Sequence, residues 1–509
     1  MQISQRKIGI LLNYANEAVK IVTALVYTPL MLRILGQSEY GLYQLVSSTV
    51  AYLSLLSLGF SGAYVRYHSR YQVKEDEQGV ARLNGMFLLV FCAMSLLCIV
   101  CGSFMVANAR LLFGNGLTAA ELKKAKILLA ILVAGMTLTF PKSVFNCYIT
   151  AHEAFFFQKI LQLAQNMMNP FLALPLLLMG HGSIAVVLVS AVLTLVTLLL
   201  DIWFCVKRLS MKISFWGMQF SLLKEMFAFT FFIFLNQIVD QANWGVDKFL
   251  LGRISGTEAV AVYGIGGQIN SLYVQMSLSI SGVFAPQINK IVASSDDNVA
   301  LTNLMIKVGR IQFILIALIM TGFIFFGRPF IRLWAGEGYE QAYWVAFLLM
   351  LPMTGPLIQN IGIEIQRAKN KHQVRSVVYF CLALCNILLS IPLIRKWGCV
   401  GAAAGTAISL IAGNVVFMNW YYHRHMGLNM YTFWKNILPL LVSTLIASLG
   451  GWALAAHVEI NGWGTFAVCV ALYTLLYGVV IWFVGLNEYE KQTATGILNK
   501  LQSARERNG

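Results

Sequence analysis

The sequence predicts an all-α, polytopic membrane protein built from two homologous halves. Three observations lead to this fold class: an apolar composition, apolar runs of membrane-spanning length, and landmark residues that recur at a fixed offset. Of the 509 residues, 58% are hydrophobic and 11% are charged, whereas roughly 25% of residues are charged in soluble domains. Runs of about 20 apolar residues are long enough to cross a hydrocarbon core as helices.

About fourteen such runs follow one another along the chain, and each predicts one transmembrane helix. They lie near residues 8–32, 40–64, 83–108, 126–149, 155–179, 183–206, 226–249, 259–285, 308–327, 341–363, 374–394, 398–422, 434–456 and 463–485. The first run contains Asn13, Glu17 and Lys20 and lacks a small-residue cleavage site, so we expect a retained helix and not a secretory signal.

Helix-breaking and polar landmarks of the first half recur 216 or 217 positions later. The pairs are Asn169 and Asn386, Pro175 and Pro392, Gly182 and Gly398, and the Leu35-Gly36 and Leu251-Gly252 dipeptides. A shared offset across separate landmarks indicates an internal duplication. We therefore predict two six-helix lobes at 1–215 and 216–430, two additional helices at 431–487 and a cytoplasmic tail at 488–509. Paired lobes predict a transporter with its site between them.

The distribution of Lys and Arg predicts the orientation, because these residues are retained on the cytoplasmic side. Of the 37 Lys and Arg residues, 25 lie in segments that are inner if the N-terminus is inside, 11 lie in outer segments, and Lys20 lies within a helix. Both termini are therefore predicted to be cytoplasmic. The net charge of +16 is explained by this topology and by attraction to anionic lipid headgroups, without a nucleic-acid partner.

Several chemistries are disfavoured by what the sequence lacks. It contains no G-x-x-x-x-G-K-[ST] loop for nucleotide hydrolysis. The nine cysteines are scattered, and the Cys98–Cys101 pair has no second ligand pair, so buried small hydrophobes are the better interpretation. We predict a transporter that is not an enzyme, with no cofactor and no metal.

The candidate substrate site consists of polar residues within apolar helices. Asn13, Asn16, Glu17 and Lys20 follow a helical i, i+3, i+4, i+7 spacing and share one face. Ionisable groups are costly at the bilayer centre unless they face water or a partner, so this face is predicted to line the cavity. The seventh helix carries the opposing row, and three further residues extend the set. These are Asn236, Gln237, Asp240, Asn243 and Asp247, with Gln44, Arg66 and Asn270.

Each candidate has a structural alternative. Amides in membranes often bridge helices, and this interpretation is favoured for Asn169 and Asn386, which precede prolines. Arg66 could catch a phosphate or anchor its helix at the cytoplasmic interface. A Glu17–Lys20 ion pair without a substrate role also remains open.

Several segments resemble a known family. Arg33-Ile34-Leu35-Gly36, Tyr40-Gly41-Leu42-Tyr43 and Leu58-Gly59-Phe60 with Arg66 look like the opening of the polysaccharide and oligosaccharide flippases of the multidrug/oligosaccharidyl-lipid/polysaccharide exporter superfamily. The Gly-Ala-rich stretch at 397–403 is similar to that family as well. The resemblance implies transport of an undecaprenyl-pyrophosphate-linked oligosaccharide across the bacterial inner membrane by alternating access. It also implies that the last two helices form a groove for the lipid tail.

Two function classes follow. The first is a flippase, in which Lys20 and Arg66 contact the pyrophosphate while amides and tyrosines contact sugar hydroxyls. The alternative is a proton- or sodium-coupled multidrug antiporter, in which Glu17, Asp240 and Asp247 carry the coupling ion and meet cationic drugs. The fourteen-helix layout favours the flippase. We expect a monomer whose partners are the lipid-linked oligosaccharide, membrane lipids and a coupling ion, H⁺ or Na⁺.

Overall fold

The protein is predominantly helical in the residues described by the computed structural model, which are 2–114, 116–217, 221–281, 284–294, 297–369, 371–488, 490–492 and 495. Within these residues, nine helical stretches are long and apolar enough to cross a membrane. The prediction of an all-α polytopic membrane protein is confirmed. The number of crossings and the duplication remain predictions.

The chain forms two compact units, which we describe separately. Unit 1 contains residues 1–265 and 376–406, and unit 2 contains residues 266–375 and 407–509. Helices α9 (Thr257–Ser281) and α14 (His372–Leu410) each contribute to both units. The lobe boundaries predicted from the repeat, 1–215 and 216–430, are a different division of the chain and remain a prediction.

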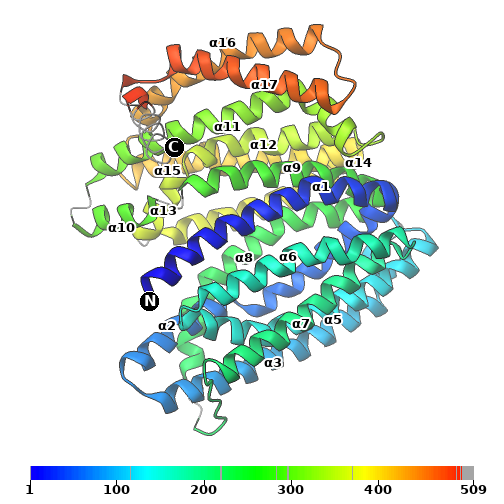
Figure 1. The fold of residues 1–509 in the computed structure, drawn as a ribbon, viewed down its shortest axis with the longest axis vertical. Coiled ribbons are helices and arrows are strands. Elements are labelled where there is room, and N and C mark those ends of the chain that lie inside the picture. The colour runs from blue at the N-terminus through cyan, green and yellow to red at the C-terminus, as the bar shows by residue number, and fades with distance from the viewer. Residues whose placement is uncertain are drawn as a thin grey trace, which may run out of the picture. The chain divides into compact units, whose positions relative to one another are not determined.

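The other helices of unit 1 run from the N-terminus to α8 (Figure 1). They are α1 (Gln2–Ala51), α2 (Phe60–Val73), α3 (Glu77–Ala107), α4 (Ala109–Phe113), α5 (Ala119–Ala151), α6 (Phe155–Leu178), α7 (Gly182–Lys207) and α8 (Ser221–Ile254). A 3₁₀ turn at Tyr52–Ser57 joins α1 to α2. Helix α5 packs between α3 and α7, and α1 packs along α6.

Unit 2 contains the remaining helices, and its last two long helices lie side by side (Figure 1). They are α10 (Ala285–Ser294), α11 (Asn298–Trp334), α12 (Gln341–Ile358), α13 (Asn360–Ala368), α15 (Met418–Arg424), α16 (Met430–His457) and α17 (Trp463–Val480). Short π-helical segments at Ile411–Phe417 and Ile481–Gly485 lie before α15 and after α17.

Two predicted pairs of membrane helices are each separated by a single non-helical glycine. The predicted runs 8–32 and 40–64 meet at Gly36 inside α1, and 374–394 and 398–422 meet at Gly398 inside α14. Gly36 has φ 74° and Gly398 has φ 56°, a left-handed conformation that glycine adopts without steric cost. The backbone turns at these points without a loop.

Side-chain caps explain where several helices begin. Asp76 accepts a hydrogen bond from the Gly79 amide at the start of α3, at 2.7 Å. Thr118 and Glu121 form a reciprocal capping box at the start of α5, which satisfies two of the amide donors left free at a helix N-terminus.

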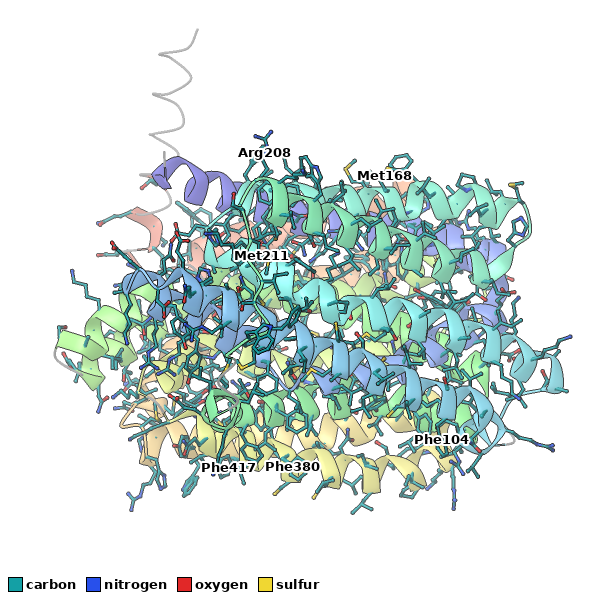
Figure 2. The ribbon with its side chains drawn as sticks, turned by 90° about the horizontal axis from the view of Figure 1, so that it is seen from below. Phe104, Met168, Arg208, Met211, Phe380 and Phe417 are labelled. Atoms are coloured by element: carbon teal, nitrogen blue, oxygen red, sulfur yellow. The ribbon has the colours of Figure 1, made fainter. Side chains whose placement is uncertain are left out.

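Large apolar side chains are exposed on the outside of unit 1, as expected for a lipid-facing surface. Phe104 on α3 is 67% exposed and Met168 on α6 is 44% exposed (Figure 2). In water such a surface would be an aggregation hazard, whereas hydrocarbon solvates it.

Candidate functional site

The polar row of α1 lies against α6 in unit 1. Asn16 is buried, and its amide donates to the Lys159 carbonyl at 3.0 Å and to the Leu12 carbonyl at 3.1 Å. Asn166 of α6 in turn donates to the Asn16 Oδ1 at 3.3 Å. Asn16 therefore bridges two helices, which is the structural role that amides often take in membranes.

The rest of the row remains accessible and carries two cations. Lys20 Nζ donates to Glu17 Oε1 at 2.9 Å, and each of these side chains is 42% exposed. One turn earlier, Lys159 Nζ of α6 donates to Asn13 Oδ1 at 2.8 Å. Lys159 was not among the candidate site residues, and only the packing of α6 on α1 brings it to this row. We call Asn13, Glu17, Lys20 and Lys159 the α1–α6 polar row.

A second polar contact joins α1 to α8 within unit 1. Lys248 Nζ donates to Gln44 Oε1 at 3.0 Å, and Gln44 Nε2 donates to the Tyr40 hydroxyl at 2.8 Å. Gln44 was a candidate site residue, whereas Lys248, at the end of the predicted helix 226–249, was counted among the 11 outer cations and was not a candidate. Its adjacency to Asp247 on a helix was the available signal.

Asp247 is fully buried and lies at the centre of a hydroxyl and amide network. Its Oδ2 accepts hydrogen bonds from the Tyr263 hydroxyl at 2.6 Å and from Thr406 Oγ1 at 2.5 Å. Asn386 Nδ2 donates to Thr406 Oγ1 at 3.3 Å, and Ser390 Oγ donates to Asn386 Oδ1 at 3.1 Å. Within the described part of the chain, Asp247 Oδ1 has no hydrogen-bond partner.

Asn169 and Asn386, the two asparagines that precede prolines, make equivalent hydrogen bonds. Asn169 Nδ2 donates to Ser190 Oγ at 2.9 Å, just as Asn386 Nδ2 donates to Thr406 Oγ1. Ser190 and Thr406 are themselves 216 positions apart. The bridging interpretation therefore accounts for both asparagines, and the second bridge is additionally tied to a carboxylate.

The remaining candidates lie on α2, α8 and α9. Arg66 lies on the exposed side of α2, Gln237 is half-buried on α8, and Asn270 is fully buried on the unit 2 part of α9. Among the described residues, Asn270 Oδ1 and Nδ2 and Gln237 Oε1 have no hydrogen-bond partner. The side chains of Asn236, Asp240 and Asn243 lie outside the described residues. Whether all twelve candidates line one cavity stays a prediction.

Two carboxylates join helix ends of unit 1 that are far apart in sequence. Glu121 Oε1 accepts from Ser38 Oγ and from Thr257 Oγ1, both at 2.7 Å. Glu39 Oε1 accepts from Lys124 Nζ at 2.6 Å and from the Ser183 amide at 2.5 Å.

Backbones also meet at this end of unit 1. A Cβ added to Gly41 would lie 1.8 Å from the Thr257 carbonyl oxygen, and one added to Gly116 would lie 2.0 Å from the Gly252 carbonyl oxygen. We call the two carboxylates, their partners and these glycines the carboxylate seam. It closes α1 and α5 against the start of α9 at the end that the basic residues predict to be outer.

Unit 2 holds an apolar groove of about 460 Å³ between α9, α11, α12 and α17. Its walls are mostly aliphatic and aromatic, with lining residues that include Ile269, Leu318, Phe326, Phe330 and Phe466. The groove is long enough along α11 to accept an extended hydrocarbon chain, because Leu315 and Phe330 both line it and fifteen residues of helix span about 22 Å.

The sequence is similar to those of known membrane proteins. The family described as "Polysaccharide biosynthesis protein" matches residues 10–292. The membrane protein EpsK of Bacillus subtilis is 22% identical over 487 residues, which cover 94% of this chain and 95% of EpsK. A protein of Shigella flexneri whose name describes it as an O-antigen transporter is 19% identical, over 81% of this chain and 96% of its own length.

Solved structures share the fold. The lipid II flippase MurJ in its inward closed conformation superposes with a TM-score of 0.72 and 18% identity, over 92% of this chain and 98% of MurJ. An inward-facing multidrug resistance MATE family transporter of the MOP superfamily gives 0.64 and 13% identity, over 79% and 94%.

The named functions among these relatives are transport and flipping, in agreement with the prediction that the chain is not an enzyme. The family profile covers more than half of the chain. This is a multi-pass membrane protein that belongs to the polysaccharide biosynthesis protein family.

Proposed function

We propose that the chain is a flippase that moves an undecaprenyl-pyrophosphate-linked oligosaccharide from the cytoplasmic to the outer leaflet of the bacterial inner membrane, by alternating access. Both termini are cytoplasmic in this proposal, and the protein acts as a monomer. The named relatives supply the substrate class, because one is named for O-antigen transport and one for lipid II.

The observation that carries the proposal is the α1–α6 polar row. It places two lysines, Lys20 and Lys159, on helices predicted to cross the membrane, with Lys20 still 42% exposed. A charge is costly in hydrocarbon unless it meets water or a partner. A pyrophosphate is a partner for these ammonium groups, and Asn13 and Glu17 offer oxygen acceptors to sugar hydroxyls beside them.

The apolar groove of unit 2 supports the same substrate. A polyprenyl chain needs a path that stays apolar while its headgroup crosses, and the groove offers about 460 Å³ of such space. The sequence resemblance implied a tail groove at the last two helices. The groove uses α17 of that pair together with α9, α11 and α12.

Asp247 is the residue we propose for the coupling cation. Its unpartnered Oδ1, together with the oxygens of Thr406, Asn386 and Ser390 in the same network, offers the oxygen donors that transporters use for Na⁺ or H⁺. Because a coupled multidrug antiporter would use such a site too, this network is the observation that keeps the antiporter as the second candidate.

Reconstituted liposomes separate the two functions. The full chain is tested with fluorescent undecaprenyl-pyrophosphate-sugar and, separately, with cationic dyes under Na⁺ and pH gradients. We expect movement of the lipid-linked sugar and no gradient-driven dye export. Dye export without sugar movement would reverse the assignment in favour of the antiporter.

A further inference from the structure

A polar pocket of about 350 Å³ opens at the end of unit 1 that the basic residues predict to be cytoplasmic. It is formed by the end of α2, the start of α3, the end of α5 and the segment after α7. Its lining includes His68, Tyr71, Glu75, Tyr148, His152 and Lys212. None of these belongs to the site described above, and the volume lies within the range of small-molecule pockets.

We propose that this pocket binds a saccharide. The choice of a saccharide rests on the proposed function, whereas the existence of a ligand site rests on the pocket itself. The two can therefore fail independently.

His68 is the residue that points to a ligand. It is 1% exposed and lines the pocket, yet within the described residues neither Nδ1 nor Nε2 has a hydrogen-bond partner. The ring is surrounded by Tyr64, Tyr148 and His152, with ring centroids 5.8, 5.6 and 5.0 Å away. A buried polar group without a partner is destabilising, and a hydroxyl group can donate to one imidazole nitrogen or accept from the other.

The charge of the pocket selects among ligand classes. Glu75, Asp76 and Glu77 line it with Lys212 as the cation, and Lys212 Nζ is bound to Glu77 Oε2 at 2.7 Å. Three carboxylates against one lysine disfavour a phosphate or another anion. Among the described residues, no cluster of three or more His, Cys, Asp or Glu side chains could hold a metal ion.

A neutral sugar ring fits the remaining aromatic and polar side chains of the pocket. A sugar has apolar C–H faces that pack on aromatic rings, here Tyr71 and Tyr148, and hydroxyl groups at its edges for carboxylates, for the Gln72 amide and for His68. The same wall is too polar for a polyprenyl chain and too acidic for a pyrophosphate. The pocket therefore suits the sugar part of the substrate only.

Three helix ends around the pocket turn through a left-handed residue. Glu75 and Ser210, which line it, have φ 54° and 50°, and Glu153, beside His152, has φ 55°. Left-handed conformations at residues other than glycine are uncommon. Here they end helices, since the Asp76 amide donates to the Tyr71 carbonyl and the Ala154 amide donates to the Ile149 carbonyl. Three of the four such residues in the described chain are at this pocket.

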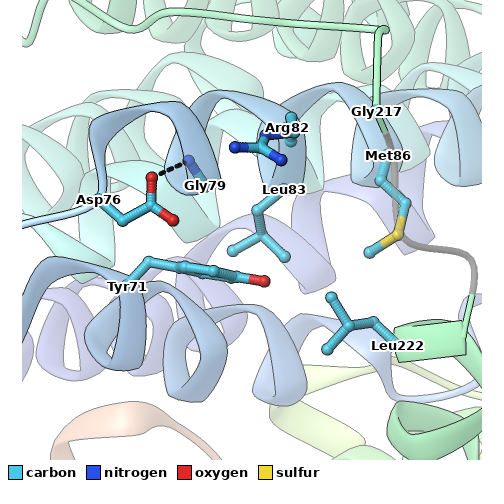
Figure 3. Close-up of a pocket in the computed structure, with 8 residues that line it drawn as sticks. All are labelled: Tyr71, Asp76, Gly79, Arg82, Leu83, Met86, Gly217 and Leu222. Atoms are coloured by element: carbon cyan, nitrogen blue, oxygen red, sulfur yellow. Dashed lines mark hydrogen bonds between the residues drawn. The ribbon is translucent and has the colours of Figure 1, made fainter. Parts of the chain in front are cut away.

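A neighbouring hollow shows by contrast what the larger pocket offers. Tyr71 and Asp76 also line a hollow of about 40 Å³ with Arg82, Met86 and Leu222 (Figure 3). In it the Asp76 carboxylate is already bonded to the Gly79 amide (Figure 3). This space holds a water molecule or two, so the saccharide belongs to the larger pocket only.

The test is saturation-transfer NMR on the full-length protein in phospholipid nanodiscs. The probes are free glucose, galactose, rhamnose, N-acetylglucosamine and N-acetylgalactosamine, which lack both lipid and pyrophosphate. We expect at least one to bind, and His68→Phe, which keeps an aromatic ring and removes both nitrogens, to weaken it about tenfold. His423→Phe, at an exposed histidine of α15, is the matched control and is expected to bind normally.

Glu75→Gln provides a second variant that does not depend on the buried ring, because Glu75 is exposed. We expect it to weaken binding severalfold with an unchanged melting temperature. Binding that both variants leave intact overturns the proposal, as does a pocket that binds none of the sugars.

The transport assay in liposomes distinguishes this failure from that of the proposed function. Flipping of the lipid-linked sugar without binding of free sugars would refute only the saccharide pocket. Sugar binding that depends on His68, without any flipping, would support the pocket and refute the flippase.

Discussion

At the scale of single residues, the charged side chains predicted to lie at membrane depth have partners that the sequence only partly predicted. The spacing of Glu17 and Lys20 predicted one helix face, and the structure shows their ion pair. Lys159 and Lys248 lie near the ends of the predicted helices 155–179 and 226–249 and were not among the candidate residues, because a lysine near the end of an apolar run has no periodicity of its own. Only the packing of α6 and α8 on α1 brings them to Asn13 and Gln44.

We predict that Lys20→Ala reduces flipping of the lipid-linked sugar at least tenfold while the protein stays folded. An ion pair this exposed contributes about 1 kcal/mol or less to stability, so the melting temperature in detergent should hardly change. Lys20→Arg keeps the charge and should retain activity, and Lys123→Ala, at an exposed lysine of α5, is the control. Normal transport by Lys20→Ala would show that the pyrophosphate role is wrong.

We predict that Asp247→Asn removes the dependence of transport on a cation gradient. The substitution keeps the shape of the side chain but removes the charge that Tyr263 and Thr406 now donate to. Initial transport rates measured with and without Na⁺ and pH gradients test this. Asp201→Asn, at another buried aspartate of unit 1, controls for the general effect of losing a buried carboxylate. A gradient dependence that survives in Asp247→Asn would contradict the assignment, and its loss in both variants would show a general effect of removing a buried carboxylate.

At the scale of elements, hydropathy predicted where the helices lie but not how short the turns between them are. Each of the fourteen apolar runs lies largely in helical segments, because membrane spans must satisfy their backbone internally. The runs on either side of Gly36 and of Gly398 were predicted as separate helices, and the structure separates them at one non-helical glycine each. The predicted gaps are longer than these turns, since composition does not show how few residues a turn needs. The repeat pointed to Asn169 and Asn386 as bridging residues. It did not point to their hydroxyl partners, because these are different residue types, Ser190 and Thr406.

Gly41→Ala tests the carboxylate seam. The new methyl group would meet the Thr257 carbonyl oxygen at 1.8 Å, so α1 and the start of α9 must separate. Overpacking of this kind costs about 1–3 kcal/mol, and we expect a lower melting temperature and greater labelling of a cysteine placed at Ser38. Gly267→Ala, where nothing lies within 4 Å of the added Cβ, should show neither effect.

Arg310→Ala tests how the segment after α17, which contains Glu490, is held in unit 2. The Arg310 guanidinium, 6% exposed, contacts Glu490 at 2.6 Å and donates to the Asn436 and Gly485 carbonyls. Removing one partner of a buried pair typically costs about 3–5 kcal/mol. Arg310→Ala should therefore lower the melting temperature strongly, and Glu490→Gln, which keeps a hydrogen-bond acceptor, should lower it less. Equal melting temperatures for both variants and the parent protein would exclude this anchoring role.

At the scale of the whole molecule, the orientation rests on the Lys and Arg distribution. We predict that a cysteine at Lys74 is protected from an impermeant thiol reagent in intact cells, whereas one at His181 is labelled. Both positions are exposed in unit 1, so burial within the protein does not bias the comparison. Permeabilised cells, in which both positions should react, provide the control. The reverse pattern in intact cells would invert the topology.

Asp247 and Lys248 are consecutive residues of one helix, and their side chains leave α8 about 100° apart. One meets Tyr263 and Thr406, and the other meets Gln44 of α1. A rotation or axial shift of α8 therefore changes both contacts together. Thermodynamic reciprocity then applies: if a cation at Asp247 weakens the Lys248–Gln44 contact by some factor, loss of that contact must raise cation affinity by the same factor. Gln44→Leu, far from the carboxylate in sequence, is expected to make the protein bind its coupling cation more tightly.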